Sequence, residues 1–403
     1  MATTVTAIPT ARAQGEPRTR AIAFTSEWPI YAVIFSSACI VVGLLWDISW
    51  HRTIGRDTFW SPPHLLEQIA AIVSGLTCGY VVLRTTFGGD AEARATSVRF
   101  WRVFRAPLGA WVCIWGTLMM ITSAPFDNWW HNAYGLDVRI ISPPHMVLAA
   151  GMIAIELGAM LLVLAAQNRA TSEHDRRRLG LLFAFAAGIV LVMVAILLEE
   201  HAAFGNHMHS AKFYKLTGIA FGLLLVAFSR ASSIHWPATV TAAVYMAIVM
   251  IAVWIFQLFP AAARLAPIYN AVTHMVPPPF PLLLIFPAIA LDLLLQRFGT
   301  GRDWLLSITI GVSFVAVMLA IHWFWSEFLL SPAARNFFFG TDQWDYSSKL
   351  GPWRYRYWGL DVDASGNWKP ALFAQGIGLA VLYTIAAARI GLWAGSGMSR
   401  VRR

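Results

Sequence analysis

Long apolar runs alternate with short polar connections along nearly the whole chain. An α-helix needs about 20 apolar residues to cross the hydrocarbon core of a bilayer, and about ten runs reach that length. The pattern predicts an all-α integral membrane protein of about ten transmembrane helices arranged as repeated helical hairpins. The expected spans are 28–47, 64–84, 106–126, 144–166, 179–200, 213–230, 237–260, 278–297, 303–325 and 371–395.

The composition supports this prediction. Hydrophobic residues make up 58% of the 403 residues and charged residues only 13%, whereas soluble domains carry about 25% charged residues. An ordinary soluble globule is therefore excluded. Cys39, Cys78 and Cys113 lie inside apolar runs without the spacing of a disulfide framework or a thiolate metal site, so we expect them to be packing residues. The polar N-terminus lacks the apolar core of a cleavable signal peptide.

Basic residues gather in alternate connections. The net charge is +9, but this distribution is typical of the positive-inside rule, and we expect no nucleic-acid partner. The rule makes the arginine-rich side cytoplasmic, with both termini on it. The arginines concerned are Arg12, Arg18, Arg20, Arg84, Arg94, Arg99, Arg102, Arg105, Arg169, Arg176, Arg177, Arg178, Arg400, Arg402 and Arg403.

The same pattern divides the chain into four parts. Residues 1–27 form a cytoplasmic tail, 28–230 hold the hairpin repeats, 231–395 hold further spans with an aromatic outer loop at 326–370, and 396–403 form a basic tail. Nine of the eleven histidines fall at outer span ends or in outer connections. Solvated histidines have no reason to prefer one side, so this asymmetry indicates a function at the outer boundary of the membrane.

One constellation occurs twice. The stretch WDISWHRTIGRDTFWSPPH (46–64) returns as FDNWWHNAYGLDVRIISPPH (126–145) with one inserted residue. Duplicated hairpins need to keep their helices and turns but not an aspartate and two histidines together, so the repetition favours a metal site. The aligned pairs are Asp47 and Asp127, Trp50 and Trp130, His51 and His131, Gly55 and Gly135, Asp57 and Asp137, and His64 and His145.

The spacing allows three ligands to converge in the first hairpin (28–84). Asp47 and His51 are four residues apart at the end of a helix, so they share one face. Gly55 permits a turn, and a Pro-Pro pair starts the next helix, whose first turn carries His64. Two imidazoles and a carboxylate suit copper, zinc or non-haem iron and leave positions open for a small molecule. In the second hairpin (106–166) the corresponding ligands are Asp127, His131 and His145.

Neighbouring side chains extend both candidate sites. We expect Trp50 and Trp130 to shield the metal, Asp57 and Asp137 to orient an imidazole, and Glu67 to be a further ligand or a proton acceptor. The alternative is that these residues are simply hydrated at the interface, where tryptophan is common. A third group is either another metal site, an entry funnel or a hydrated loop. It consists of Glu200, His201, His207 and His209.

Both spacings resemble those of a known family. Asp47-x3-His51-x12-His64 and Asp127-x3-His131-x13-His145 are similar to two copper motifs in the C subunit of the copper membrane monooxygenases, the particulate methane and ammonia monooxygenases. In that family the second motif usually begins with Asn, and the C subunits are shorter, so this chain resembles an extended relative. The resemblance covers roughly residues 28–166, or as far as 230. It implies a bacterial inner-membrane location with the metal sites near the periplasmic face. It also implies copper, cupredoxin-type and other membrane subunits as partners, and hydroxylation of a small substrate with dioxygen.

Three functions fit these observations. The first is a copper-dependent membrane monooxygenase, or its metal-binding subunit, which acts on a small apolar or gaseous substrate with an external electron donor, alone or as a homo-oligomer. The second is a membrane protein for copper transport or delivery that receives the metal on its outer histidines. The third is a haem-binding electron-transfer protein with His51 and His131 as axial ligands. Haem leaves the carboxylates and the repeated Pro-Pro-His element unexplained.

Overall fold

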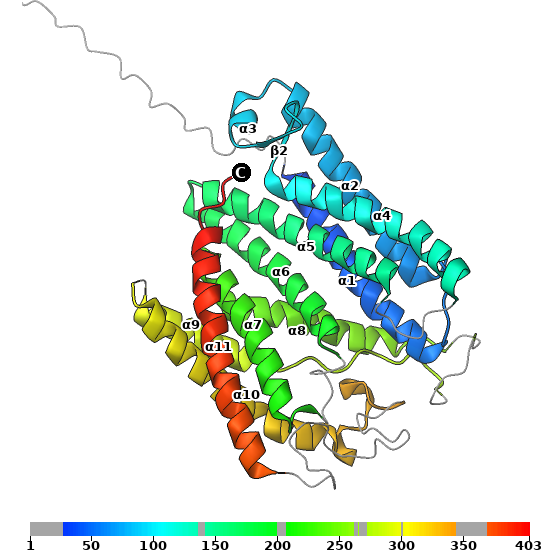
Figure 1. Ribbon diagram of the computed structural model, residues 1–403, viewed down its shortest axis with the longest axis vertical. Coiled ribbons are helices and arrows are strands. Elements are labelled where there is room, and N and C mark those ends of the chain that lie inside the picture. Colours follow the sequence, from blue (N-terminus) through cyan, green and yellow to red (C-terminus); the bar gives the residue numbers. More distant parts are fainter. Residues whose placement is uncertain are drawn as a thin grey trace, which may run out of the picture.

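The chain folds into a bundle of long helices (Figure 1). The computed structural model describes residues 27–135, 142–199, 207–261, 265, 272–299, 301–343 and 369–403. Nine helices in these ranges are long and apolar enough to cross a membrane, which confirms the predicted all-α, multi-pass architecture. They are α1 (Trp28–Thr53), α2 (Pro62–Phe87), α4 (Leu108–Tyr134), α5 (Pro143–Arg169), α6 (Glu173–Leu197), α7 (Ala211–Ala231), α8 (Pro237–Phe256), α10 (Asp303–Leu329) and α11 (Pro370–Met398).

The other described elements are short. Between α2 and α4 lie α3 (Ala91–Ala95) and an antiparallel pair of strands, β1 (Val98–Phe100) and β2 (Phe104–Ala106). Two 3-10 turns, η3 (Pro332–Ala334) and η4 (Phe337–Phe339), follow α10. Helix α7 packs along α11, and α8 packs along α6, so the helices before and after residue 230 form one bundle (Figure 1).

The predicted span 278–297 is wrong as a continuous helix. The structure has a largely buried, non-helical segment at 276–284, and only then the short helix α9 (Ile285–Phe298). The prolines at 277–279 and 281 lack amide hydrogens and restrict the residue before each of them, so a helical ladder cannot form. Hydropathy predicts that this segment is buried, but it does not distinguish a helix from an extended chain.

Side chains of neighbouring helices satisfy the backbone of this segment. The amide of Leu282 donates to the hydroxyl of Tyr245 at 3.0 Å, and the amide of Leu283 donates to Nε2 of His322 at 3.1 Å. Nδ1 of His322 lies 3.1 Å from the carbonyl oxygen of Met318 and donates to it, so the imidazole is neutral. Non-helical backbone at membrane depth is tolerated only where the protein supplies such partners.

Glycines allow a close helix contact between α4 and α5. A methyl group added at Gly109 would lie 2.4 Å from the carbonyl oxygen of Gly158, and one added at Gly116 would lie 2.7 Å from that of Gly151. The two backbones therefore pack directly, as small residues permit in membrane proteins. Between these contacts, the buried thiol of Cys113 donates to the carbonyl of Ile155 at 3.6 Å.

The two ends of the described chain lie at the same end of the bundle. The side-chain amide of Asn168, at the end of α5, donates to the carbonyl oxygens of Met398 and Val401. Arg178, near the start of α6, pairs with Glu27 just before α1 at 2.6 Å. Chain ends on the same side require an even number of membrane crossings. The nine long helices of the described ranges, together with the segment that ends in α9, give such a number. We name the end that holds these residues the inner end and the opposite end the outer end.

Part of the predicted aromatic loop covers the proline-rich segment at the outer end. The structure describes residues 326–343 and 369–370 of that loop. The ring of Phe339 lies 5.3 Å from that of Phe280 and 5.7 Å from that of Trp325, centroid to centroid. Nε1 of Trp254 donates to the carbonyl of Phe338 at 3.0 Å. These aromatic side chains therefore pack against other parts of the protein.

Candidate metal centre

The first hairpin places its predicted ligands at the outer end, between α1 and α2. Helix α1 continues to Thr53, so Asp47 and His51 lie one turn apart on the same face. Gly55 then has a φ of 86°, a left-handed conformation that glycine adopts without steric cost. The chain returns into α2, whose first turn carries His64. The predicted helix–turn–helix geometry of this hairpin is confirmed.

Four side chains converge there. Nε2 of His64 lies 2.9 Å from Oδ2 of Asp57 and 3.2 Å from Oδ1 of Asp47. Nε2 of His51 lies 3.4 Å from the same oxygen of Asp57 and 3.8 Å from Oδ2 of Asp47. Among the described residues, only Asp47, Asp57 and His64 form a group of three whose ligand atoms all lie within 4.8 Å of one another. Asp57, which we expected to orient an imidazole from outside, therefore lies inside the cluster, and His51 lies at its rim.

The imidazole of His64 is oriented as a metal ligand requires. Its Nδ1 lies 2.9 Å from the carbonyl oxygen of Thr58. A carbonyl oxygen can only accept, so Nδ1 carries a proton, and in the neutral ring the lone pair is on Nε2. Nε2 is the atom that faces the two carboxylates. Metal-ligating histidines commonly donate the N–H of their other ring nitrogen to a backbone carbonyl in this way.

The charge of the cluster suits a divalent cation. With neutral imidazoles, the carboxylates of Asp47 and Asp57 contribute −1 each, which gives −2 for the cluster. When the imidazoles are protonated instead, burial raises the pKa of Asp57, but the hydrogen bonds and charges of His51 and His64 outweigh burial and hold that pKa well below its usual range. Asp57 therefore stays ionised. Two carboxylates this close need a cation, or protons on the imidazoles, to offset their repulsion.

Two buried carboxylate oxygens at this site have no hydrogen-bond partner among the described residues. One is Oδ1 of Asp47, which lies near His64 but outside hydrogen-bonding geometry. The other is Oε1 of Glu67, a residue that is 2% exposed and packs against Gly43 of α1. Leaving a buried acceptor unpaired costs free energy. A cation at the cluster would satisfy Asp47, and Glu67 lies one turn deeper on the same helix pair.

Other contacts fix the loop that carries Asp57. Nε1 of Trp50 donates to the carbonyl of Arg56 at 3.0 Å, so this tryptophan holds the loop next to Asp57. Arg52, at the end of α1, forms an ion pair with Glu199 beyond the end of α6. The sequence does not predict this pair, because 147 positions separate its members. The sequence also does not predict the hydrogen bond from His64 to the carbonyl of Thr58, because any residue can supply a backbone carbonyl.

The second hairpin repeats part of this arrangement at the outer ends of α4 and α5. Nε2 of His131 lies 3.4 Å from Oδ2 of Asp127, and its Nδ1 lies 3.1 Å from the carbonyl oxygen of Gly135. The same ring nitrogen therefore faces the carboxylate as in the first hairpin. Gly135 has a φ of 86°, the value of its aligned glycine in the first hairpin. Oδ1 of Asp127 is also buried without a hydrogen-bond partner in the described ranges.

The second cluster is less complete within the described residues. Nδ1 of His145 lies 2.6 Å from the hydroxyl of Ser142, and three ligand atoms of this hairpin do not come within 4.8 Å of one another in the part of the chain that the structure describes. Asp137, the counterpart of Asp57, lies outside those residues. The ring of Trp130 lies 4.5 Å from that of Tyr134, centroid to centroid, beside the site.

The predicted third group is only partly described, because Glu200 and His201 lie outside the described residues. His207 and His209 are buried. Nδ1 of His209 lies 3.0 Å from the hydroxyl of Ser326, and its Nε2 lies 3.4 Å from Oε1 of Glu327. These two histidines are therefore packed at the outer end and not hydrated. Sequence reasoning missed Glu327, which lies on a helix more than 100 positions away.

Comparison with family models, with curated proteins and with solved structures found no match. The fold and the site define a class nonetheless. The protein is an all-α, multi-pass membrane protein. It carries a carboxylate–histidine cluster between two helices at one end of its bundle.

Proposed function

We propose that this chain is a copper-dependent membrane monooxygenase or the metal-binding subunit of one. The cluster of Asp47, Asp57 and His64, with His51 at its rim, carries the proposal. Its two negative charges, its unpaired buried oxygen and its oriented imidazole suit a divalent cation. Imidazole and carboxylate ligands are compatible with copper, zinc and iron. The resemblance of both hairpin spacings to copper motifs favours copper.

Each residue of the cluster then has a role. His64 and His51 would hold the metal through Nε2, and Asp47 and Asp57 would balance its charge. Bound copper supplies the redox chemistry that activates dioxygen. Glu67, which is buried one turn below His64, would accept a proton. Substrate would come from the surrounding bilayer, which fits a small apolar or gaseous molecule.

The orientation of the chain belongs to the same proposal. The arginine-rich connections between α2 and α4 and between α5 and α6 lie at the inner end, which supports a cytoplasmic inner end. The clusters would then face the periplasm of a bacterial inner membrane. Cupredoxin-type and other membrane subunits, and further copies of the chain itself in a homo-oligomer, would dock around this face. Electrons would come from an external donor.

Isotope-labelled dioxygen tests the proposal. Copper-loaded full chain in detergent is supplied with a quinol and with small hydrocarbons or ammonia. One atom of 18O2 should enter the product, and the other should leave as water with two electrons from the quinol. His64→Ala should abolish the product, whereas His274→Ala, at an exposed outer histidine, should retain it.

Two results would redirect the function. Copper-loaded protein that consumes no oxygen with any of these substrates, but moves copper into proteoliposomes, would contradict the monooxygenase and favour transport. A haem absorption spectrum of the purified protein would favour electron transfer.

A further inference from the structure

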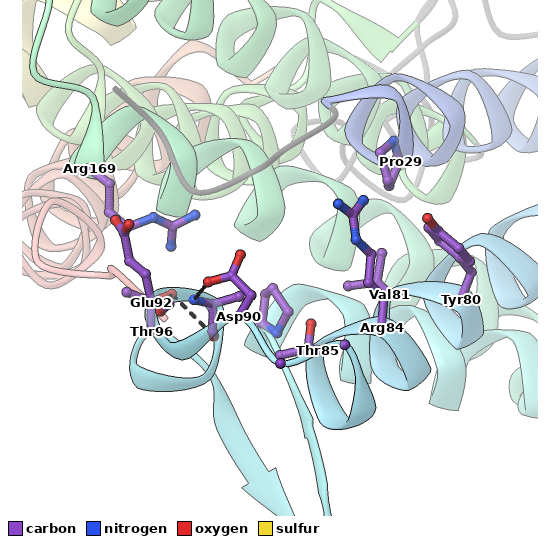
Figure 2. Close-up of a pocket in the computed structure, with 13 residues that line it drawn as sticks. Pro29, Tyr80, Val81, Arg84, Thr85, Asp90, Glu92, Thr96 and Arg169 are labelled. Carbon is purple, nitrogen blue, oxygen red and sulfur yellow. Dashed lines mark hydrogen bonds between the residues drawn. The ribbon is translucent and has the colours of Figure 1, made fainter. Parts of the chain in front are cut away.

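A cavity of about 410 Å³ lies at the inner end of the bundle, away from the metal cluster (Figure 2). The start of α1, the last turns of α2, helix α3 and the end of α5 line it. Its volume falls within the range of about 300–1,000 Å³ that is typical of small-molecule sites. Its charged lining residues are Arg84, Arg169, Asp90 and Glu92.

Two arginines stand on opposite sides of this cavity (Figure 2). Arg84 comes from the last turn of α2, and its guanidinium forms no ion pair within the described ranges. Arg169 comes from the end of α5 and donates to the carbonyl of Arg402. Guanidinium groups match the geometry and charge of phosphate oxygens. The pair therefore favours a ligand that carries a phosphate group.

Two carboxylates line the same cavity. One oxygen of Asp90 accepts from the amide of Ala93 at 3.0 Å, and its second oxygen has no hydrogen-bond or ion-pair partner within the described ranges. Glu92 lies beside Arg169 (Figure 2). Carboxylates repel a ligand that is only anionic, and arginines repel one that is only cationic. Both signs together suit a zwitterion that contains a phosphate and an ammonium group.

The cavity lies where lipid headgroups would reach it. Tyr80 lines the cavity, and its ring packs 5.5 Å from that of Trp28 at the start of α1. Both rings are exposed on the surface of the bundle, as aromatic residues are at a membrane interface. Leu76 and Leu83 are exposed in the neighbouring turns of α2, where acyl chains would lie.

We propose that this cavity binds the headgroup of an aminophospholipid, a phosphate diester with a primary ammonium group. The phosphate would lie between Arg84 and Arg169, and the ammonium group would lie at Asp90 and Glu92. Basic pockets between membrane helices on the cytoplasmic side bind phospholipid headgroups, and here two carboxylates line the pocket together with two arginines. This inference is independent of the metal cluster and of the proposed monooxygenase function.

Thermal unfolding of the full chain in detergent tests the site. Phosphatidylethanolamine should raise the unfolding midpoint more than phosphatidylcholine, whose quaternary ammonium cannot donate hydrogen bonds, and more than phosphatidylglycerol. Arg84→Gln should weaken the apparent affinity for phosphatidylethanolamine about tenfold, because it removes a charged hydrogen bond to phosphate. Arg99→Gln, at an exposed arginine of β1, is the matched control and should leave it unchanged.

A second variant tests the ammonium subsite. The double change Asp90→Asn and Glu92→Gln should shift the preference from phosphatidylethanolamine to phosphatidylglycerol, and Asn keeps the cap of α3. Equal stabilisation by all three lipids, or an unchanged affinity in Arg84→Gln, would overturn the proposal. If soluble glycerophosphoethanolamine stabilises the chain and none of the lipids does, the ligand is not a lipid, and the cavity is assigned to a soluble phosphate ester.

Discussion

Replacing Asp57 with asparagine tests whether this residue is a ligand of the metal or only an orienting neighbour. Asparagine keeps the shape of the side chain but removes one of the two negative charges at the cluster. Two unit charges 4 Å apart interact by about 1 kcal/mol in water and by about 4 kcal/mol at an effective dielectric constant of 20. The cluster side chains are between 15% and 46% exposed, which is an intermediate environment. We expect a loss of about 2 kcal/mol, or roughly 30-fold in copper affinity.

The assay is competition for copper between the full chain in detergent and a chromophoric chelator. Asp47→Asn should lose a similar factor, because its carboxylate faces the same nitrogen of His64. Asp342→Asn, at an exposed acid of the outer end, should bind copper as the unmodified chain does. If Asp57→Asn binds copper as tightly as the control, the placement of Asp57 inside the cluster is refuted.

Three further predictions concern packing and protonation. Gly116→Ala brings a methyl group 2.7 Å from the carbonyl oxygen of Gly151 and should lower stability by about 1–3 kcal/mol in thermal unfolding. Gly79→Ala is the control, because its methyl group meets nothing within 4 Å. An equal unfolding midpoint for both variants would contradict the direct contact between α4 and α5. His322→Phe removes the acceptor of a buried amide and should lower the free energy of unfolding by about 1–3 kcal/mol. His322→Gln keeps an acceptor and should lower it less. Equal losses of stability in the two variants would argue against that hydrogen bond. Copper should dissociate as pH falls, because protons compete with the metal for the imidazole nitrogens of His51 and His64. Protonated His51 and His64 lower the pKa of Asp57, so this carboxylate stabilises the metal-free fold above the unfolded carboxyl pKa of about 4 and loses that effect only as pH falls through its lower folded pKa. A copper content that does not fall with pH would contradict the imidazole ligands.

Features with a local, periodic signal could be predicted from the sequence. Hydropathy predicts the nine long helices, because each must present an apolar surface over its full length. The four-residue spacing of Asp47 and His51 predicts a shared helical face, which the structure has. The aligned Gly55 and Gly135 predict turns, and both have a φ of 86°.

Features that depend on tertiary contacts could not be predicted. Asp57 lies in a connection without periodicity, so its place inside the cluster follows only from how Trp50 and the Thr58 carbonyl hold that loop. The extended segment before α9 depends on hydrogen bonds that its amides donate to Tyr245 and His322 on separate helices. The sequence shows the prolines of this segment but not the side chains that stabilise the segment within the bundle.

Copper analysis of the full chain after loading and desalting tests the central claim most directly. The unmodified chain should retain one or two copper ions, His64→Ala should lose one of them, and His274→Ala should lose none. A chain that retains no copper, or a His64→Ala variant with an unchanged copper content, would contradict the assignment of this cluster as a metal site.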